Sequence, residues 1–275
     1  MSETPNQSSG GVRLVEIDAE QAGQRIDNFL LRELKGVPKS RIYRILRKGE
    51  VRVNRGRIAP TYRLQQGDSV RIPPVRISTG GFAAPPVGAI ERLKNRVILE
   101  HPHFLIIDKP AGMAVHGGSG LSYGVIEAMR AWRTDLRFLE LVHRLDRATS
   151  GCLLLAKRRS ALRRLHLLVR ENRLDKRYMA LVRGHWPDET RVVAAPLRKN
   201  VLSSGERMVR VDESGKDSET RFAVVERYPG ATLVEARLLT GRTHQIRVHT
   251  AHMGHPLAGD DKYGDSDWNR ALNRL

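Results

Sequence analysis

Three segments of the sequence concentrate polar side chains that could do chemistry. The first is the run His143-Arg144-Leu145-Asp146-Arg147, in which an aspartate stands between two arginines. Nearby positive charge favours the ionised form of a carboxyl group. An ionised Asp146 could therefore act as a nucleophile or as a general base. The alternative is an ordinary salt bridge within a loop, which the spacing alone favours.

The other two segments lie further along the chain. Lys176-Arg177-Tyr178 opens an expected strand, where a tyrosine is either an aromatic at the edge of the core or a ring that stacks on a base. The third segment runs from Leu239-Thr240 through Gly241-Arg242-Thr243-His244-Gln245-Ile246-Arg247-Val248-His249. It continues through His252 and Gly254-His255-Pro256 to Gly259-Asp260. Its arginines and histidines could contact an anionic substrate.

The four histidines of the third segment raise the question of a metal site. Their spacings of 5, 3 and 3 residues do not match a HExxH helix, and the sequence has no cysteine nearby. We therefore expect no metal, and predict that these histidines form hydrogen bonds or face RNA.

The charge of the chain points to a polyanionic partner. Its 275 residues include 48 Lys and Arg against 30 Asp and Glu, a net charge of +18. Arginine outnumbers lysine, and its guanidinium fork matches phosphate geometry and stacks on bases. A GC-rich genome explains the arginine bias equally well, but not the net charge. An acidic lipid surface is the weaker alternative, because no long amphipathic helix is evident.

Several classes of protein are excluded. No apolar run is long enough to cross a bilayer, and the polar start Met1-Ser2-Glu3-Thr4-Pro5 does not resemble a signal peptide. These features argue against a membrane-spanning or secreted protein. The one cysteine, Cys152, cannot form an internal disulfide, which fits a reducing cytosol.

The polar segments must be positioned by a domain in which expected strands outnumber helices. Short apolar strands are predicted at 104–107, 152–156, 178–182, 221–225 and 233–237, and a helix at 160–171. The helix would turn Leu162, Leu165, Leu168 and Val169 inward. Short turns between strands favour an α+β fold with a mainly antiparallel mixed sheet flanked by helices.

The chain divides into four predicted regions. Residues 1–22 should form a disordered tail, 23–76 a small basic α/β domain, 77–94 a linker and 95–275 the larger domain. In the small domain, Arg41, Arg44 and Lys48 form a basic stripe on an expected helix. A stripe of this kind is either a solvated face or a binding surface for RNA phosphates. The candidate RNA-binding residues of this domain are Arg25, Lys39, Arg41, Arg44, Lys48, Arg52 and Arg55.

Two resemblances to known families follow from these motifs. Residues 23–74 resemble the S4 RNA-binding domain through Arg25-Ile26-Asp27, Lys39-Ser40-Arg41, Lys48-Gly49-Glu50-Val51 and Val53-Asn54. Residues 97–264 resemble the RluA/RluC/RluD family of pseudouridine synthases. The motifs that carry this likeness occur in the family's order: His143-Arg144-Leu145-Asp146, Thr149-Ser150-Gly151, Gly241 to His249 and Gly254-His255-Pro256. With the S4-like domain in front, the chain is most similar to the RluC type.

The resemblance implies a pseudouridine synthase fold and the isomerisation of specific uridines in 23S ribosomal RNA without a cofactor. It implies that Asp146 is the catalytic aspartate, that Tyr178 stacks on the target base and that Arg247 pairs with the aspartate. Arg144 would help to displace the flipped nucleotide, whereas Arg242 and His249 would bind substrate without separately assigned roles. Whether Asp146 adds to the base or deprotonates the sugar stays open.

Two other functions remain as alternatives, and the C-terminal segment departs from the family pattern. The rivals are a catalytically inert rRNA-binding or ribosome-assembly factor on the same fold, and a metal-dependent nuclease that uses the histidines. Family members usually continue beyond Tyr263-Gly264 with a strand containing Leu-His-Ala, so we expect the segment ending at Leu275 to be truncated or unusual. We expect a monomer, because no dimer seam is evident.

Overall fold

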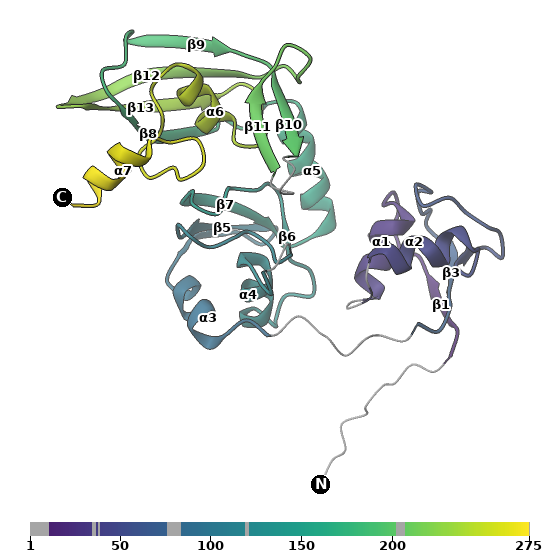
Figure 1. Cartoon of the computed structure of the whole chain (residues 1–275). Helices are drawn as coiled ribbons and strands as arrows, with labels where there is room; N and C mark the ends of the chain where they lie inside the picture. Colours follow the sequence, from purple (N-terminus) through teal and green to yellow (C-terminus); the bar gives the residue numbers. More distant parts are fainter. Residues whose placement is uncertain are drawn as a thin grey trace. The chain divides into compact units, whose positions relative to one another are not determined.

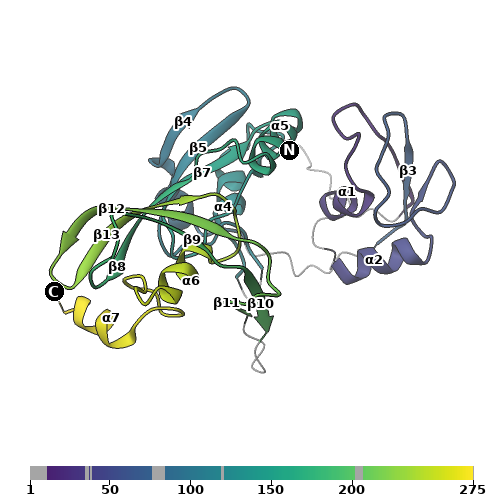
Figure 2. The same cartoon turned by 90° about the horizontal axis from the view of Figure 1, so that it is seen from above.

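The computed structural model describes residues 11–34, 37, 39–75, 84–118, 121–201 and 207–274 (Figures 1 and 2). The chain divides into two compact units, residues 1–165 and 166–275. Among the described residues, no helix is both long and apolar enough to cross a membrane.

The N-terminal part of the first unit has its own core. Helices α1 (Ile26–Glu33) and α2 (Lys39–Arg47) pack with a three-stranded antiparallel sheet of order β1-β3-β2. Its strands are β1 (Arg13–Glu16), β2 (Arg52–Val53) and β3 (Ser69–Ile72). The side chains that form the first helix's apolar face are all buried, as their helical spacing predicts: Ile26, Phe29, Leu30 and Leu34.

The prediction that residues 1–22 form a disordered tail was wrong for the second half of that range. Residues 13–16 form β1, which pairs with β3 along its whole length, and Ile17 is 1% exposed in the core. The strand is short and mostly exposed, so it has no alternation of apolar and polar residues that could reveal it. Residues 1–10 lie outside the described residues.

The predicted linker was also partly wrong. Residues 87–94 form helix α3 (Val87–Lys94), which buries Ala89 and Leu93. These two residues are four positions apart, so they share one helix face. Only these two side chains of the helix are buried, and so short a pattern does not predict a helix. Residues 77–83 of this region lie outside the described residues.

The rest of the first unit is built on an antiparallel sheet of order β4-β5-β7-β6. Its strands are β4 (Val97–Glu100), β5 (Phe104–Lys109), β6 (Glu140–Leu141) and β7 (Gly151–Ala156), accompanied by helix α4 (Val125–Trp132). The strands expected at 104–107 and 152–156 are confirmed as β5 and β7. Leu105 and Ile107 of β5 and Leu153 and Leu155 of β7 are fully buried.

The second unit contains a longer antiparallel sheet of order β8-β13-β12-β9. Its strands are β8 (Arg177–Arg183), β9 (Thr190–Ala194), β12 (Glu219–Tyr228) and β13 (Ala231–Leu238). Trp186 and Phe222 are fully buried in its core, with ring centroids 4.9 Å apart. A hairpin of β10 (Leu197–Val201) and β11 (Arg207–Val211) and helices α6 (Gln245–His252) and α7 (Ser266–Leu272) complete this unit.

Helix α5 (Arg159–Arg170) runs across the sequence boundary between the two units. It confirms the predicted helix, but none of its residues is fully buried, and the expected inward positions are half-buried. All pairings between the described strands are antiparallel, which confirms the α+β prediction. The larger domain has one four-stranded sheet in each unit instead of a single sheet.

Candidate functional site

Asp146 lies in the loop that precedes β7. Its side chain is half-buried, between the buried Leu145 and the exposed Arg147, while Arg144 is exposed. The backbone N–H of Thr149 donates to the carbonyl oxygen of Asp146 at 3.2 Å, which forms a turn. Leu145 anchors the loop in the core of the first unit, and the carboxylate is held partly accessible beside it.

Lys109, at the end of β5, supports this loop from inside the protein. It is fully buried, and its Nζ donates to the carbonyl oxygens of Pro110 at 2.9 Å, Met113 at 2.8 Å and Arg147 at 3.1 Å. Burial lowers the pKa of Lys109 to about 8, although the negative charge of Asp146 acts in the opposite direction. The ammonium is therefore still mostly charged at neutral pH, and it places a cation near the carboxylate of Asp146.

The turn that follows β5 is tied to the same loop by its backbone. The N–H of Gly112 donates to the carbonyl oxygen of Arg147 at 2.9 Å, and Nε of Arg147 donates back to the carbonyl of Gly112 at 3.0 Å. Gly112 has φ +80°, a left-handed conformation that favours glycine. The run Asp108-Lys109-Pro110-Ala111-Gly112 also fits the family pattern, but it predicts no role for Lys109. The signal was present, because the alternation of β5 places Lys109 on the same face as the buried Leu105 and Ile107.

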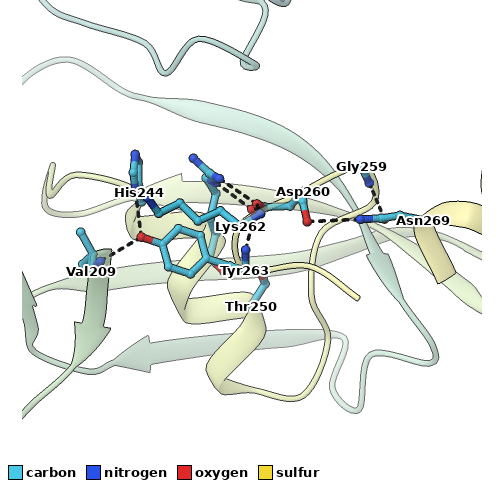
Figure 3. A network of polar contacts seen from close by, with 9 residues as sticks. Val209, His244, Thr250, Gly259, Asp260, Lys262, Tyr263 and Asn269 are labelled. Carbon is cyan, nitrogen blue, oxygen red and sulfur yellow. Dashed lines mark hydrogen bonds and ion pairs between the residues drawn. The ribbon is translucent and has the colours of Figure 1, made fainter. Parts of the chain in front are cut away.

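In the second unit, Arg247 on α6 forms a bidentate ion pair with Asp260. Nε donates to Oδ2 and Nη2 to Oδ1, each at 2.7 Å. Oδ1 of Asp260 also accepts the backbone N–H groups of Lys262 at 2.9 Å and Tyr263 at 3.0 Å (Figure 3). Burial alone would raise the pKa of Asp260, but the ion pair and these hydrogen bonds lower it. Asp260 is therefore an ionised, nearly buried group that orients the guanidinium.

Tyr263 and Asn269 extend this network (Figure 3). The guanidinium carbon of Arg247 lies 5.0 Å from the ring centroid of Tyr263, a cation–π geometry. The Tyr263 hydroxyl accepts the backbone N–H of Val209 at 2.9 Å and lies 2.9 Å from Nδ1 of His244. Asn269 of α7 accepts from the N–H of Gly259 at 2.8 Å and donates to the carbonyl of Asp260 at 3.2 Å.

His249 does not face the surface, and we revise its expected role as a substrate contact. It is fully buried, with Nε2 3.0 Å from the carbonyl oxygen of Ala195 and Nδ1 3.0 Å from the Thr220 hydroxyl. Because a carbonyl only accepts, Nε2 carries the hydrogen and Nδ1 accepts from Thr220. Burial lowers the pKa of His249 and favours the neutral ring. The side chain thus holds α6 against the strands and leaves no surface for RNA.

The exposed Arg242 starts the turn into α6. Its Nε donates to the carbonyl oxygen of Asp217 at 2.9 Å, and its backbone N–H donates to Oε1 of Gln245 at 2.9 Å. Gln245 is 2% exposed and also hydrogen-bonds Thr240, Glu219 and Thr220. It therefore fixes the loop before Arg247. Nothing in the sequence distinguishes it from the other polar residues of this motif.

Tyr178 lies on β8 opposite Ala236 of β13, half-buried against the core of the second unit. The predicted site residues thus belong to both units. Arg144 and Asp146 come from the first unit, and Tyr178, Arg242 and Arg247 come from the second. Within the first unit Asp146 is accompanied by Lys109, and within the second Arg247 is accompanied by Asp260.

The candidate RNA-binding residues of the N-terminal domain differ in their surroundings. Arg44, Lys48, Arg52 and Arg55 are exposed and Arg41 is half-buried, whereas the side chain of Lys39 lies outside the described part. Arg25 forms hydrogen bonds of 2.6 and 3.1 Å to Asp27, which also accepts from the Tyr43 hydroxyl at 2.8 Å. Asp27 therefore joins α1 to α2 through Tyr43, and Arg25 is committed to the same carboxylate. The exposed cations are the better candidates for phosphate contacts.

The other histidines of the third segment have separate partners. His244 lies beside the Tyr263 hydroxyl, and Nδ1 of His255 lies 2.8 Å from the carbonyl oxygen of Arg183. In the part of the chain that the structure describes, no three His, Cys, Asp or Glu side chains gather in a group that could hold a metal ion.

Comparison with known proteins gives one family for the larger domain and an S4 domain in front of it. The family model described as RNA pseudouridylate synthase matches residues 103–252, and the S4 domain model matches residues 24–70. The chain is 60% identical over 266 residues to the ribosomal large subunit pseudouridine synthase C of Pasteurella multocida, covering 96% of this chain and 82% of that protein. The protein of the same name from Escherichia coli K12 is 59% identical over 273 residues, which cover 98% and 84%.

Two solved structures support the same family. The human RNA pseudouridylate synthase domain containing 1 superposes with a TM-score of 0.56 at 26% identity, over 65% of this chain and 72% of that one. A second human protein, RNA pseudouridylate synthase domain containing 4, superposes with a TM-score of 0.54 at 26% identity, over 66% and 73%. The expected resemblances of both parts of the chain are thereby confirmed.

Proposed function

Because the chain belongs to the RNA pseudouridylate synthase family, we propose that it isomerises uridines of large-subunit (23S) ribosomal RNA to pseudouridine. The observation that carries this proposal is the 59–60% identity, over nearly the whole chain, to proteins named ribosomal large subunit pseudouridine synthase C. The S4 domain and the net charge of +18 support an RNA substrate.

The reaction balances without any added group. The N1–C1′ bond of uridine breaks, the uracil turns, and a C5–C1′ bond forms. C5 then loses its proton and N1 gains one, so that the product is an isomer of the substrate. The base must leave the RNA stack first, which costs a few kcal/mol that protein–RNA contacts must offset.

We assign the chemical step to Asp146. Its carboxylate either adds to the base or removes a proton from the sugar, and both steps need the ionised form. Nζ of Lys109 places a positive charge near this carboxylate and, through the Arg147 carbonyl, holds the loop in place. Tyr178 supplies the ring that stacks on the uracil, and Arg144 helps to displace the flipped nucleotide. Arg247, oriented by Asp260, supplies the guanidinium that the family pairs with the aspartate.

The remaining contacts fix the RNA. The exposed Arg44, Lys48, Arg52 and Arg55 would bind phosphates of the RNA, which gives affinity without base choice. Arg242 at the start of α6 would contact the substrate near the site. We further propose that the protein acts as a monomer in the cytosol, where its rRNA substrate is made.

Tritium release tests the reaction. A 23S rRNA transcript labelled at C5 of uridine should lose tritium to water with the parent protein and not with Asp146→Asn. Asp146→Asn should bind the transcript with an affinity within a few-fold of the parent. A parent that binds the RNA without releasing tritium would instead be an rRNA-binding or assembly factor. Turnover retained in Asp146→Asn would remove this carboxylate from the mechanism.

A further inference from the structure

The β10–β11 hairpin places two arginines directly opposite each other. Arg198 of β10 is the cross-strand partner of Arg210 of β11, and their side chains are 57% and 62% exposed. Like charges at directly opposed positions of an antiparallel pair destabilise it. The hairpin therefore carries an electrostatic cost that requires a compensating anion.

One carboxylate supplies part of this compensation. Oδ2 of Asp212 lies 3.1 Å from Nη2 of Arg210 and 3.7 Å from Nη1 of Arg198. Ser214 holds this carboxylate through its N–H at 3.0 Å and its hydroxyl at 2.5 Å, and the hydroxyl accepts from Arg198 at 3.0 Å. The two guanidinium groups are thus held side by side, with one positive charge in excess.

The other face of the hairpin is anchored in the protein. Leu197 and Val209 are each 5% exposed and pack with Val248 of α6, the helix that carries Arg247. The N–H of Val209 also donates to the Tyr263 hydroxyl. Because neighbouring residues of a strand point to opposite faces, the two arginines lie on the solvent face. The hairpin is visible beside α6 and apart from the four-stranded sheet of this unit in Figure 1.

We propose that Arg198 and Arg210 form a phosphate-binding pair for the backbone of the RNA substrate. A backbone phosphate carries one negative charge, which matches the excess charge of the pair, and two guanidinium forks can each donate to its oxygens. The contact positions the RNA on the second unit without selecting a base. The identity of this ligand rests on the proposed function.

A second pair of arginines in the same unit provides a matched control. Arg191 is paired with Asp188 at 2.9 Å, and Arg227 is paired with Glu189 at 2.6 Å. Each of these arginines has a carboxylate of its own, so the pair has no excess charge. Replacing them removes two charges from the protein, as replacing Arg198 and Arg210 does.

The test is binding of an unmodified 23S rRNA transcript to the full chain over a series of salt concentrations. The double variant Arg198→Gln/Arg210→Gln should bind several-fold more weakly, and the slope of log affinity against log salt should fall by about one. Arg191→Gln/Arg227→Gln should change the slope by less than half as much. An unchanged slope in the first variant, or equal losses in both, would overturn the proposal.

Two further measurements separate the possible causes of a loss. Arg198→Lys/Arg210→Lys keeps both charges and should keep the parent's salt slope. A slope that falls equally in the lysine and glutamine variants would indicate damage to the hairpin and would overturn the assignment. The RNA concentration that gives half-maximal tritium release should rise several-fold in the glutamine variant and stay near the parent's in Arg191→Gln/Arg227→Gln. If the parent releases no tritium, the proposed function fails, whereas parent turnover with an unaffected salt slope rejects only the phosphate-binding pair.

Discussion

Arg247 and Asp260 form a two-pronged ion pair, in which both nitrogen–oxygen distances are 2.7 Å. The carboxylate is nearly buried and receives two further hydrogen bonds from the backbone of the turn that follows it. A guanidinium held at two points on a fixed carboxylate loses most of its freedom to rotate. The arginine that the motif singles out is therefore oriented by an acid outside that motif, and Asp260 is a positioning residue for it.

Replacing Asp260 by asparagine should lower kcat more than it raises KM. The asparagine amide has one accepting oxygen, so it cannot accept both hydrogen bonds of the Arg247 guanidinium. A hydrogen bond to a charged group contributes ~1.5–3 kcal/mol. Losing that amount from the transition state corresponds to roughly a 10- to 100-fold loss of rate. Steady-state tritium release measures the two constants. Asp267→Asn serves as the control, because Asp267 is 84% exposed and pairs only with Arg270 in the described contacts. A lower melting temperature with unchanged kcat would show that Asp260 only stabilises the fold.

Replacing Lys109 by methionine should reduce both stability and turnover. The apolar chain has a similar length but removes the Lys109 donor from the buried carbonyl oxygens of Pro110 and Met113, and each such group costs roughly 1–3 kcal/mol. The Arg147 carbonyl also loses Lys109 but keeps the N–H of Gly112. It also removes the positive charge near Asp146. Urea denaturation and tritium release at a temperature where the variant is folded would measure the two effects. A folded variant with parental turnover would exclude Lys109 from positioning the Asp146 loop.

The sequence predicts local elements of this protein better than its long-range pairs. Strands β5 and β7 and helix α1 follow from apolar spacing, because each buries one face. Strand β1 was missed because it is stabilised by pairing with β3, more than fifty residues away. The pair of Arg247 and Asp260 spans a turn, and only the fold brings the two together.

Motif membership also does not tell a substrate contact from a supporting residue. Arg242, Arg247 and His249 stand in one run, yet Arg242 is exposed and His249 is completely buried. The difference comes from helix geometry: in α6 Val248 and His249 turn toward the strands, and Arg247 is half-exposed toward Asp260 and Tyr263. The apolar residues Ile246, Val248 and Ala251 are interspersed with polar ones and give α6 no clear amphipathic pattern from which this orientation could be predicted.

Two substitutions of Tyr178 should distinguish the contribution of its ring to RNA affinity from that of its hydroxyl. Tyr178→Phe keeps the ring and should keep RNA affinity close to that of the parent. Tyr178→Ala should lose ~1–3 kcal/mol of binding, the contribution of stacking one base on an aromatic side chain. Filter binding of the 23S transcript measures both variants, and their melting temperatures correct for the packing of Tyr178 against the core. Equal losses of affinity in the two variants would contradict a stacking role.

The loss of folding stability at acidic pH should depend on Glu100. This carboxylate accepts from Arg133 at 2.8 and 2.9 Å and from Lys157 at 2.7 Å, and these bonds lower the pKa of Glu100 to about 2. Because the folded pKa lies below the ordinary value of 4.5, the stabilisation is complete above pH 4.5 and is lost as the pH falls toward 2. The side chain is 37% exposed, so solvent screening reduces the effect to ~1–2 kcal/mol.

The free energies of unfolding of the parent and of Glu100→Gln, measured by urea denaturation, should therefore differ at pH 7, differ clearly less at pH 3, and converge only as the pH falls toward 2. Glu91→Gln is the matched control, because Glu91 is 54% exposed and forms a pair with Lys94 one turn away on α3. Its free energy of unfolding should follow that of the parent at both pH values. A constant difference between the parent and Glu100→Gln from pH 7 to pH 3 would mean that the contribution of Glu100 does not depend on its charge, and that the ion pairs to Arg133 and Lys157 add nothing to stability.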